Sequence, residues 1–441
     1  MVDVGDAESD EAIRAIRQVL HERAIFPVYQ PIVDLASGTL VAVEALARGP
    51  AGSVVETPDR LFAAATRAGC LPEVDMLCGA RALELARDTP DRMPPLVFVN
   101  AEPAAFARPL TPDLMKVIND DLPYRIVLEF TERALGAYPP GLLNIANMVH
   151  RFGNALALDD VGADPLSLAF LPLIEPEVVK LDMHVVRHPR AGTSVETAEV
   201  VSAYAERTGA VVVAEGLETE QDVTSALALG AQWGQGWFYG RPVPPHRLSD
   251  RPVNPAAQLR PARRDLHLPT GTPFATAASR QPARNGDRYL LDQFVDHLLR
   301  AAGAAGRHAV VLAATPDLAT TTAWLPRLAD VARTAAFVGL AGPAPSPSPQ
   351  TEMHIAPVPP DARDRRETTL IVVGPQLAVA VCAEPGDAGQ PTRFVLSHDA
   401  DVVHTIGRML LHRLDRATTR LTPPSGQPWA TQPAPAAPAN R

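Results

Sequence analysis

Short apolar runs that alternate with helical patterns are the feature that most constrains the fold of this chain. They extend from residue 26 to residue 244. The first two, Phe26–Val33 and Leu40–Leu46, are joined by a turn at residues 34–38. Repeated strand, helix, strand order implies parallel strands with helices outside the sheet. The later runs are Leu96–Asn100, Arg125–Glu129, Ala155–Asp159, Val178–Lys180, Val211–Glu215 and Ala231–Gln235.

About eight such runs in roughly 240 residues fit a closed barrel of the TIM type. An open doubly wound sheet is the alternative, but it normally carries a Gly-rich phosphate loop after an early strand. No such loop follows an early run of this sequence. We therefore predict an α/β fold built on a (β/α)8 barrel.

Carboxylates, amides and one lysine stand at the ends of these runs. The carboxyl ends of barrel strands meet at one face, so these side chains are expected to converge there. Taken alone, Glu44 is equally compatible with a hairpin in which it pairs with an arginine, but the repetition along the chain favours a shared site. The residues are Glu44, Asn100, Glu129, Asp159, Asp160, Lys180, Glu215 and Gln235.

The five carboxylates of this set would repel one another in a buried site unless cations neutralise them. Oxygen-rich ligation of this kind suits hard divalent ions, Mg²⁺ or Mn²⁺. The adjacent Asp159 and Asp160 suit two ions that lie close together. That arrangement is used for in-line hydrolysis of phosphoesters, so the sequence predicts a hydrolytic site with two cations.

The distribution of proline marks the domain boundaries. Residues 1–244 contain the predicted barrel, and residues 245–287 are rich in Pro, Arg and Ala without a sustained period, which predicts a linker. Residues 288–420 regain strand and helix patterns and predict a small α+β domain. Residues 421–441 form a Pro- and Ala-rich tail with no predicted core.

Net charge and cysteine content limit which cellular compartment and which classes of partner are expected. A formal net charge of −10 argues against binding of duplex nucleic acid. Three cysteines without CxxC spacing indicate reduced thiols. The acidic N-terminus has no signal-peptide pattern, and no apolar run reaches the ~20 residues of a membrane span. We therefore expect a cytoplasmic protein without membrane insertion.

The runs and their flanking residues form motifs that read, in order, YQPIVDL, VEALARG, VFVN, LEFTE, LALDD, VVKLD, VVAEGLETEQD and GQGWFYGRPVP. Over residues 18–244 the sequence resembles the EAL-domain cyclic-di-GMP phosphodiesterases. The resemblance implies a modified TIM-type barrel and hydrolysis of cyclic di-GMP to linear pGpG with two Mg²⁺ or Mn²⁺ ions. The alternative within the same family is a receptor that binds cyclic di-GMP and signals without turnover.

The resemblance also implies a role for each site residue. One cation would be held by Glu44, Asn100, Glu129 and Asp159, and the other by Asp159, Asp160 and Glu215. Lys180 would lie beside the attacking water, so the expected catalytic residues are Lys180, Glu215 and Glu44. Arg48 would bind a phosphate. The dinucleotide would be positioned by Gln30, Asp182, Glu218 and Gln235, and Glu132 would brace the loop after Asp160.

The sequence departs from the family pattern in the loop Val161–Leu166. It reads DDVGADPLSL where the family usually has DDFGTGYSSL, so Asp164 and Pro165 replace a glycine and an aromatic residue. Proline fixes its own φ and disfavours helical geometry at the residue before it. We expect near-normal affinity for cyclic di-GMP but weak binding of the second cation. The same loop contributes to the family's dimer contact, and a homodimer is one expected assembly.

The C-terminal domain, residues 288–420, faintly resembles the DICT sensory domain, which accompanies EAL domains in actinobacterial proteins. It has no cluster of acids, histidines or cysteines of its own. We expect it to regulate the barrel in response to a signal or partner protein that the sequence does not identify. The alternative is a passive appendage.

Simpler structural roles are expected for several other residues. Glu220 and Asp222 suit the first turn of a helix, where acids complement the helix dipole. His184 is expected at the surface because the site is rich in oxygen ligands. Trp233 and Trp237 are expected in the core rather than beside a guanine.

Overall fold

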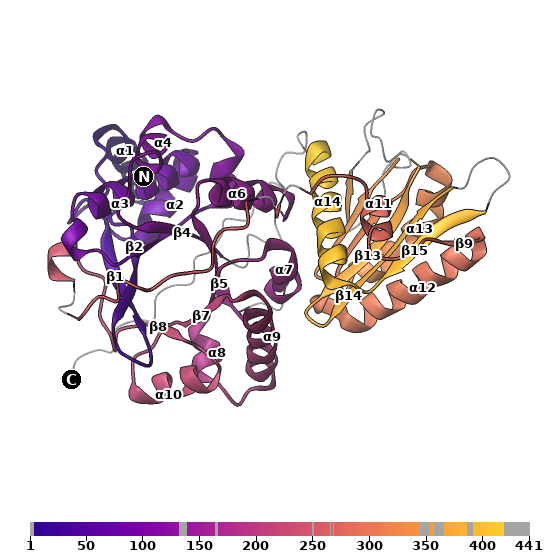
Figure 1. Ribbon diagram of the computed structural model, residues 1–441. Helices are drawn as coiled ribbons and strands as arrows, with labels where there is room; N and C mark the ends of the chain where they lie inside the picture. The colour runs from indigo at the N-terminus through magenta and orange to yellow at the C-terminus, as the bar shows by residue number, and fades with distance from the viewer. Residues whose placement is uncertain are drawn as a thin grey trace.

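The computed structural model of this protein describes residues 4–131, 139–163, 166–248, 251–264, 266–267, 269–343, 353–356, 366–385 and 391–418. Within these residues the chain forms a closed eight-stranded barrel and a separate seven-stranded sheet. Figure 1 shows the barrel beside the sheet, with α14 (Ala400–Thr418) on the side of the sheet that faces the barrel. The predicted barrel followed by an α+β unit is therefore confirmed.

An antiparallel hairpin opens the barrel. β1 (Val28–Asp34) pairs with β2 (Leu40–Leu46), and the register sets Gln30 opposite Glu44. β1 is also antiparallel to β8, so its amino-terminal end lies at the rim where the other strands end. The other neighbouring strands pair in parallel. They are β3 (Leu96–Asn100), β4 (Arg125–Thr131), β5 (Ala155–Val161), β6 (Val178–Leu181), β7 (Val211–Ala214) and β8 (Trp233–Gln235).

Helices cover the outside of the barrel, and local signals define their ends. α10 begins with a capping box in which Thr219 and Asp222 each accept a hydrogen bond from the backbone of the other. This confirms the first-turn role expected for Asp222. The helices are α1 (Val4–Glu22), α2 (Pro58–Ala68), α3 (Leu71–Arg87), α4 (Pro112–Ile118), α6 (Pro139–Arg151), α7 (Leu166–Ile174), α8 (Met183–Arg187), α9 (Gly192–Thr208) and α10 (Glu220–Ala228).

Apolar side chains at alternate positions of the strands fill the barrel lumen. Ala42, Phe98 and Val127 are buried there, whereas Val97 and Val99 of β3 face the surrounding helices. Successive side chains of a strand point to opposite faces, and both faces of a barrel sheet are covered. The strands therefore read as continuous apolar runs in the sequence.

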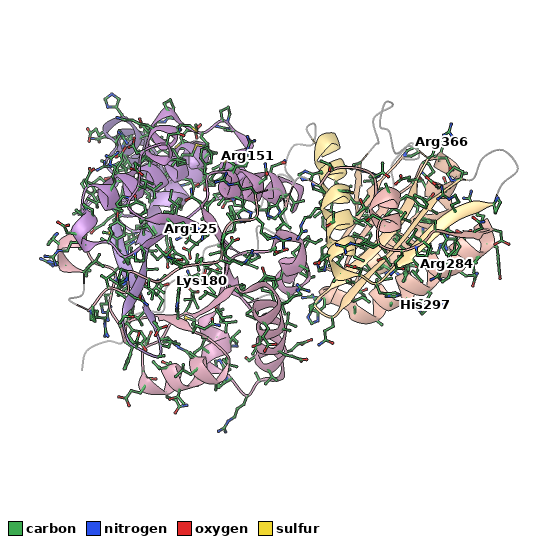
Figure 2. The ribbon with its side chains drawn as sticks, in the orientation of Figure 1. Arg125, Arg151, Lys180, Arg284, His297 and Arg366 are labelled. Atoms are coloured by element: carbon green, nitrogen blue, oxygen red, sulfur yellow. The ribbon has the colours of Figure 1, made fainter. Side chains whose placement is uncertain are left out.

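The strap, residues 251–264, closes the other end of the lumen. Its Ala257 and Leu259 are buried among the lumen side chains, and its Val253 bridges to the start of β2. Arg125 of β4, labelled in Figure 2, donates hydrogen bonds to the carbonyl oxygens of Leu259 and Arg260 at 3.3 and 2.9 Å. Part of the predicted linker is therefore packed against the barrel. Ala257 and Leu259 are not part of a periodic apolar pattern, so the sequence does not indicate that this segment enters the lumen.

The C-terminal unit is a mixed sheet with the strand order β12-β11-β10-β13-β14-β15-β9. One face packs against α12 (Arg288–Ala305) and α13 (Leu318–Ala332), and the other against α11 (Pro273–Ala278) and α14. Residues 368–384 form an antiparallel hairpin of β13 and β14. The strands are β9 (Arg284–Gly286), β10 (Val310–Ala314), β11 (Phe337–Ala341), β12 (His354–Ala356), β13 (Thr368–Gly374), β14 (Leu377–Glu384) and β15 (Thr392–Ser397).

Some sequence predictions concern residues that the structure does not describe. The tail at 421–441 lies outside the described residues, as do Glu132, Asp164 and Pro165. Among the helices of the described ranges, none combines the length and apolar character required to cross a membrane.

Candidate active site

The polar side chains of the site stand two residues after a lumen residue of the same strand or strand end. Because side chains alternate between the two faces of a strand, this spacing points them into the barrel at its carboxyl rim. The pairs are Ala42 and Glu44, Phe98 and Asn100, Val127 and Glu129, Ala157 and Asp159, Val178 and Lys180, Val213 and Glu215, and Trp233 and Gln235.

Lys180 lies at the centre of this rim and is completely buried. Figure 2 shows it inside the barrel. Its Nζ is within ion-pair distance of four carboxylates from four strand ends. The distances are 2.7 Å to Glu215 Oε1, 2.8 Å to Glu129 Oε1, 3.1 Å to Asp159 Oδ1 and 3.3 Å to Glu44 Oε2.

The electrostatics of the site reflect an excess of negative charge around one ammonium group. Burial lowers the pKa of Lys180, but the carboxylates outweigh it and hold that pKa well above its usual range. Burial raises the pKa of Glu129 well above normal, and neighbouring Glu44 adds to the effect. Burial and Asp159 likewise raise the pKa of Glu215. One lysine does not neutralise the cluster, so the site favours additional positive charge.

Two amides hold the carboxylate of Glu44. Asn100 Nδ2 donates to its Oε1 at 2.8 Å, and Gln235 Nε2 donates to its Oε2 at 2.6 Å. Gln235 Nε2 also lies 3.1 Å from Gln30 Oε1, which brings the antiparallel β1 into the site. Burial raises the pKa of Glu44, but Lys180 and the two amides lower it below normal, so this carboxylate stays ionised.

A bulge in β5 brings two consecutive acids to the same rim. Leu158 pairs with Val179 and Val161 pairs with Leu181, so Asp159 and Asp160 together oppose the single residue between. Asp160 has φ 57°, a conformation that non-glycine residues rarely adopt. Without the bulge, the alternation along β5 would direct Asp160 away from Asp159.

The donor atoms of the site fit divalent cations. Carboxylate oxygens of Asp159, Asp160 and Glu215 lie within 4.8 Å of one another. Within the described part of the chain, the buried Glu129 Oε2 accepts no hydrogen bond, and Glu129 Oε1 and Asp159 Oδ1 are paired only with the shared Lys180 ammonium. Unsatisfied buried carboxylate oxygens are costly without a cation, and hard cations take oxygen ligands.

Three further predicted site residues follow strand ends at the same rim, and among the described residues no hydrogen bond or ion pair joins them to this cluster: Arg48, Asp182 and Glu218. Arg48 donates to the carbonyl oxygen of Ala47 at 2.7 Å, and burial lowers its pKa. Asp182 caps α8 by accepting from the backbone NH of His184 at 2.7 Å. His184 itself is exposed, as predicted.

Glu218 has a partner that the sequence did not indicate. Its carboxylate pairs with Arg187 of α8 at 2.9 Å, and Arg187 also donates to the carbonyl oxygen of Gly216. Arg187 therefore joins the β7–α10 connection to α8. Nothing in its sequence context distinguishes it from other surface arginines.

The prediction for the two tryptophans is correct only for Trp233, which is buried in the lumen. Trp237 is 48 % exposed, and the Arg241 guanidinium lies 3.8 Å from its ring centroid. The chain turns after β8, with Tyr239 N donating to Gly236 O, so the strand alternation no longer applies at Trp237.

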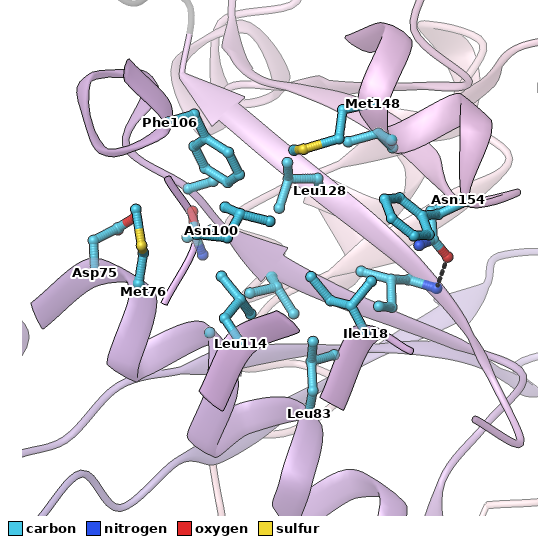
Figure 3. Close-up of a pocket in the computed structure, with 17 residues that line it drawn as sticks. Asp75, Met76, Leu83, Asn100, Phe106, Leu114, Ile118, Leu128, Met148 and Asn154 are labelled. Carbon is cyan, nitrogen blue, oxygen red and sulfur yellow. Dashed lines mark hydrogen bonds between the residues drawn. The ribbon is translucent and has the colours of Figure 1, made fainter. Parts of the chain in front are cut away.

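A separate cavity of about 60 Å³ lies between α3, α4 and α6, outside the lumen. Figure 3 shows Leu114, Ile118 and Leu128 around it, with Asp75 and Asn100 toward one end. Burial raises the pKa of Asp75 to about 8. Apart from Asp75, Asn100 and Asn154, the described residues that line the cavity are apolar.

The family model described as EAL domain matches residues 13–242, just over half of the 441 residues. This chain belongs to the EAL domain family. The EAL match covers the barrel and all the rim residues described above, and it ends before the strap.

Curated relatives carry the same region at modest identity. The probable cyclic di-GMP phosphodiesterase PdeB of Escherichia coli K12 is 29% identical over 238 residues, covering 52% of this chain and 45% of the relative. The cyclic di-GMP phosphodiesterase NbdA of Pseudomonas aeruginosa is 28% identical over 241 residues, covering 52% of this chain and 30% of the relative. The matched region therefore spans less than half the length of either relative.

Solved EAL structures align with the same half of the chain. Klebsiella pneumoniae BlrP1, in a manganese and cyclic-di-GMP complex, has 27% identity and a TM-score of 0.44, covering 50% of this chain and 56% of that one. The PaMucR phosphodiesterase in complex with c-di-GMP has 24% identity and a TM-score of 0.46, covering 54% and 99%.

Proposed function

We propose that this EAL barrel hydrolyses cyclic di-GMP to linear pGpG with two divalent cations, Mg²⁺ or Mn²⁺. The observation that carries the proposal is the buried Lys180 among Glu44, Glu129, Asp159 and Glu215, with a net negative charge left over. The names of the EAL relatives support the choice of substrate.

The donor set divides into two groups that share Asp159. Glu44, Asn100, Glu129 and Asp159 would hold one cation, and Asp159, Asp160 and Glu215 the other. Bound cations of this kind act as Lewis acids and generate hydroxide from water near neutral pH. The β5 bulge presents Asp159 and Asp160 on one side, which is what sharing between two groups requires.

Lys180 would orient the attacking water and balance negative charge that develops on the phosphate. Carboxylates from four strands surround its Nζ, so the ammonium is held in place without help from solvent. Glu215, at 2.7 Å from Nζ, fixes the side of the ammonium that faces β7. A preorganised cation of this kind needs little rearrangement during the reaction.

The residues around the rim would bind the dinucleotide. Arg48 has further N–H donors beyond the one that bonds to Ala47 O, and a planar guanidinium suits a phosphate. Gln30 and Gln235 present amides beside the acidic cluster, and Asp182 and Glu218 lie on the connections after β6 and β7.

A receptor without turnover is the second candidate. The ammonium of Lys180 already pairs with four carboxylates, so the barrel can keep its rim intact and bind a ligand without cations. The altered loop at residues 161–166 points the same way, although its Asp164 and Pro165 lie outside the described residues.

We also propose that the C-terminal unit regulates the barrel. Its support is the docking of α14 on α6 and α7 of the barrel, which share one apolar core with the second sheet. A DICT-like sensory role and a homodimer stay predictions.

Parallel assays of binding and turnover separate the two candidates. Purified protein with Mn²⁺ or Mg²⁺ is expected to convert cyclic di-GMP to pGpG, and Glu44→Ala is expected to abolish conversion. Glu206→Ala removes an exposed carboxylate on α9 and serves as the matched control with unchanged turnover. Binding measured by calorimetry without any product in the wild type would favour the receptor and contradict the enzyme.

A further inference from the structure

The C-terminal end of α7 is held by an arginine from the other structural unit. Arg408 of α14 donates from Nε to Leu173 O and from Nη2 to Pro172 O, both at 2.9 Å. The same Nη2 lies 3.0 Å from Glu175 Oε2. Arg408 is only 2 % exposed. The last carbonyl groups of a helix lack partners within the helix and carry partial negative charge, so a buried guanidinium stabilises this end.

Glu175 directly follows the last residue of α7, and its backbone conformation is unfavourable unless other contacts stabilise it. Its φ is 54°, which is unusual for a residue with a side chain. Its buried carboxylate pairs with Arg408 and with Arg263 of the strap, and Arg260 donates to its carbonyl oxygen. Such conformations persist where surrounding contacts determine them. Here those contacts come from α14 and the strap.

Close packing also ties α7 to the C-terminal unit. A Cβ on Gly407 of α14 would lie 2.6 Å from Leu173 Cδ2, so the two helices meet where there is no room for a side chain. Phe170 of α7 contacts Phe337 of β11 edge to face, with 5.8 Å between ring centroids. α7 is thus packed between the barrel and the second sheet.

α7 is also the first helix after the acids of β5. Asp159 and Asp160 lie in β5, and α7 begins at Leu166. Between them Gly162 has φ 101°, and a Cβ there would lie 2.5 Å from Val185 of α8 and 3.1 Å from Thr197 of α9. The backbone at Gly162 is therefore packed closely against α8 and α9, and the next described element along the chain is α7.

We propose that Arg408 is a positioning residue for the acidic pair. By holding the C-terminal end of α7, Arg408 fixes the helix that follows the acidic pair along the chain, and so sets how tightly Asp159 and Asp160 bind a divalent cation. The C-terminal unit acts on the site through this contact. The inference rests on the proposed function in one respect, that these acids are cation ligands.

The test measures Mn²⁺ binding to the full chain by calorimetry, with no nucleotide present. Arg408→Ala is expected to weaken the affinity of the weaker Mn²⁺ site by about 10–100-fold, the usual effect of removing a residue that orients a ligand. Arg408→Lys keeps the positive charge but loses the planar fork, so an intermediate affinity is expected. Arg300→Ala, an exposed arginine of α12, is the matched control with unchanged affinity.

A second variant guards against loss of folding. Gly407→Ala keeps every charge and forces the contact between α14 and Leu173 to rearrange, and it is expected to weaken Mn²⁺ binding in the same direction. Circular dichroism identifies variants that remain folded. For those, turnover should be rescued by high Mn²⁺ with an unchanged KM for cyclic di-GMP, which general damage to the fold would not produce.

The outcomes distinguish this inference from the proposed function. Wild-type Mn²⁺ affinity in a folded Arg408→Ala, or in a folded Gly407→Ala if the former does not fold, would overturn the positioning role. A wild type that binds Mn²⁺ and loses affinity on Arg408→Ala but never hydrolyses cyclic di-GMP would support the positioning role and defeat the proposed function.

Discussion

Lys180 Nζ lies 2.8 Å from Glu129 Oε1, and both side chains are fully enclosed at the carboxyl rim of the barrel. The charges at this site do not cancel, because Glu44, Asp159 and Glu215 also surround the same ammonium. Lys180 thus stabilises a cluster that would otherwise repel itself. Its contribution is greatest when no divalent cation shares the site.

Replacing Lys180 by methionine should destabilise the cation-free protein. Removing one partner of a buried charge cluster costs about 3–5 kcal/mol. Mn²⁺ should restore much of the loss by neutralising the same carboxylates, while turnover stays absent. Thermal unfolding of wild type and Lys180→Met, with and without Mn²⁺, checks this. Equal melting temperatures without cations would contradict the role given to Lys180.

The turn after the acidic pair should not tolerate a side chain at Gly162. Its φ of 101° and the 2.5 Å approach of Val185 Cγ2 leave no room for a Cβ. Gly162→Ala is expected to cost about 1–3 kcal/mol of unfolding free energy. Gly192→Ala is the control, because nothing lies within 4 Å of a Cβ at the start of α9. Denaturant unfolding compares the two, and similar stabilities would refute the strain argument.

The buried acid Asp75 should make stability depend on pH. Burial raises its folded-state pKa to about 8, so between about pH 4, where the unfolded acid ionises, and pH 8 the folded state binds more protons than the unfolded state. Stability contributed by the protonated form is therefore lost as pH rises through this window. Asp75→Asn should flatten the dependence and stay more stable at neutral pH. Unfolding curves across this range provide the check, and parallel curves for both proteins would contradict it.

The altered loop leads to a prediction about cation concentration. Asp164 and Pro165 stand where the family has glycine and an aromatic residue, and weak binding of the second cation follows if the loop no longer supports Asp160. Turnover should then keep rising with Mn²⁺ or Mg²⁺, and Asp164→Gly with Pro165→Tyr should saturate at lower concentration, by about 10–100-fold. Saturation of the wild type at low cation, without gain in the double variant, would make the loop a neutral variation.

Much of the site follows from the sequence because it depends on strand ends. Glu129 and Lys180 each end an apolar run and Glu44 lies near the end of another, and parallel strands bring such ends together. The bulge that brings Asp160 beside Asp159 depends on local backbone geometry, and the sequence LALDD does not predict it. The prediction for Trp237 is wrong for a related reason, because β8 ends at Gln235 and the chain then turns.

Contacts between distant segments account for the rest. Arg408 meets Leu173 across 235 residues of sequence, and no periodicity in either helix points to the other. The strap was predicted as a linker because proline and arginine dominate it, yet Leu259 reaches the lumen and Arg125 holds its backbone. Such pairings are set by the packing of whole units, which single-sequence patterns do not contain.

The most direct test of the central claim is the product formed from cyclic di-GMP in water labelled with heavy oxygen. With Mn²⁺ or Mg²⁺, the purified full chain is predicted to yield linear pGpG that carries one labelled oxygen on its terminal phosphate, and Glu44→Ala is predicted to yield none. Mass spectrometry reads both outcomes. Intact cyclic di-GMP after long incubation with either cation, or labelled product formed equally by Glu44→Ala, would contradict the account.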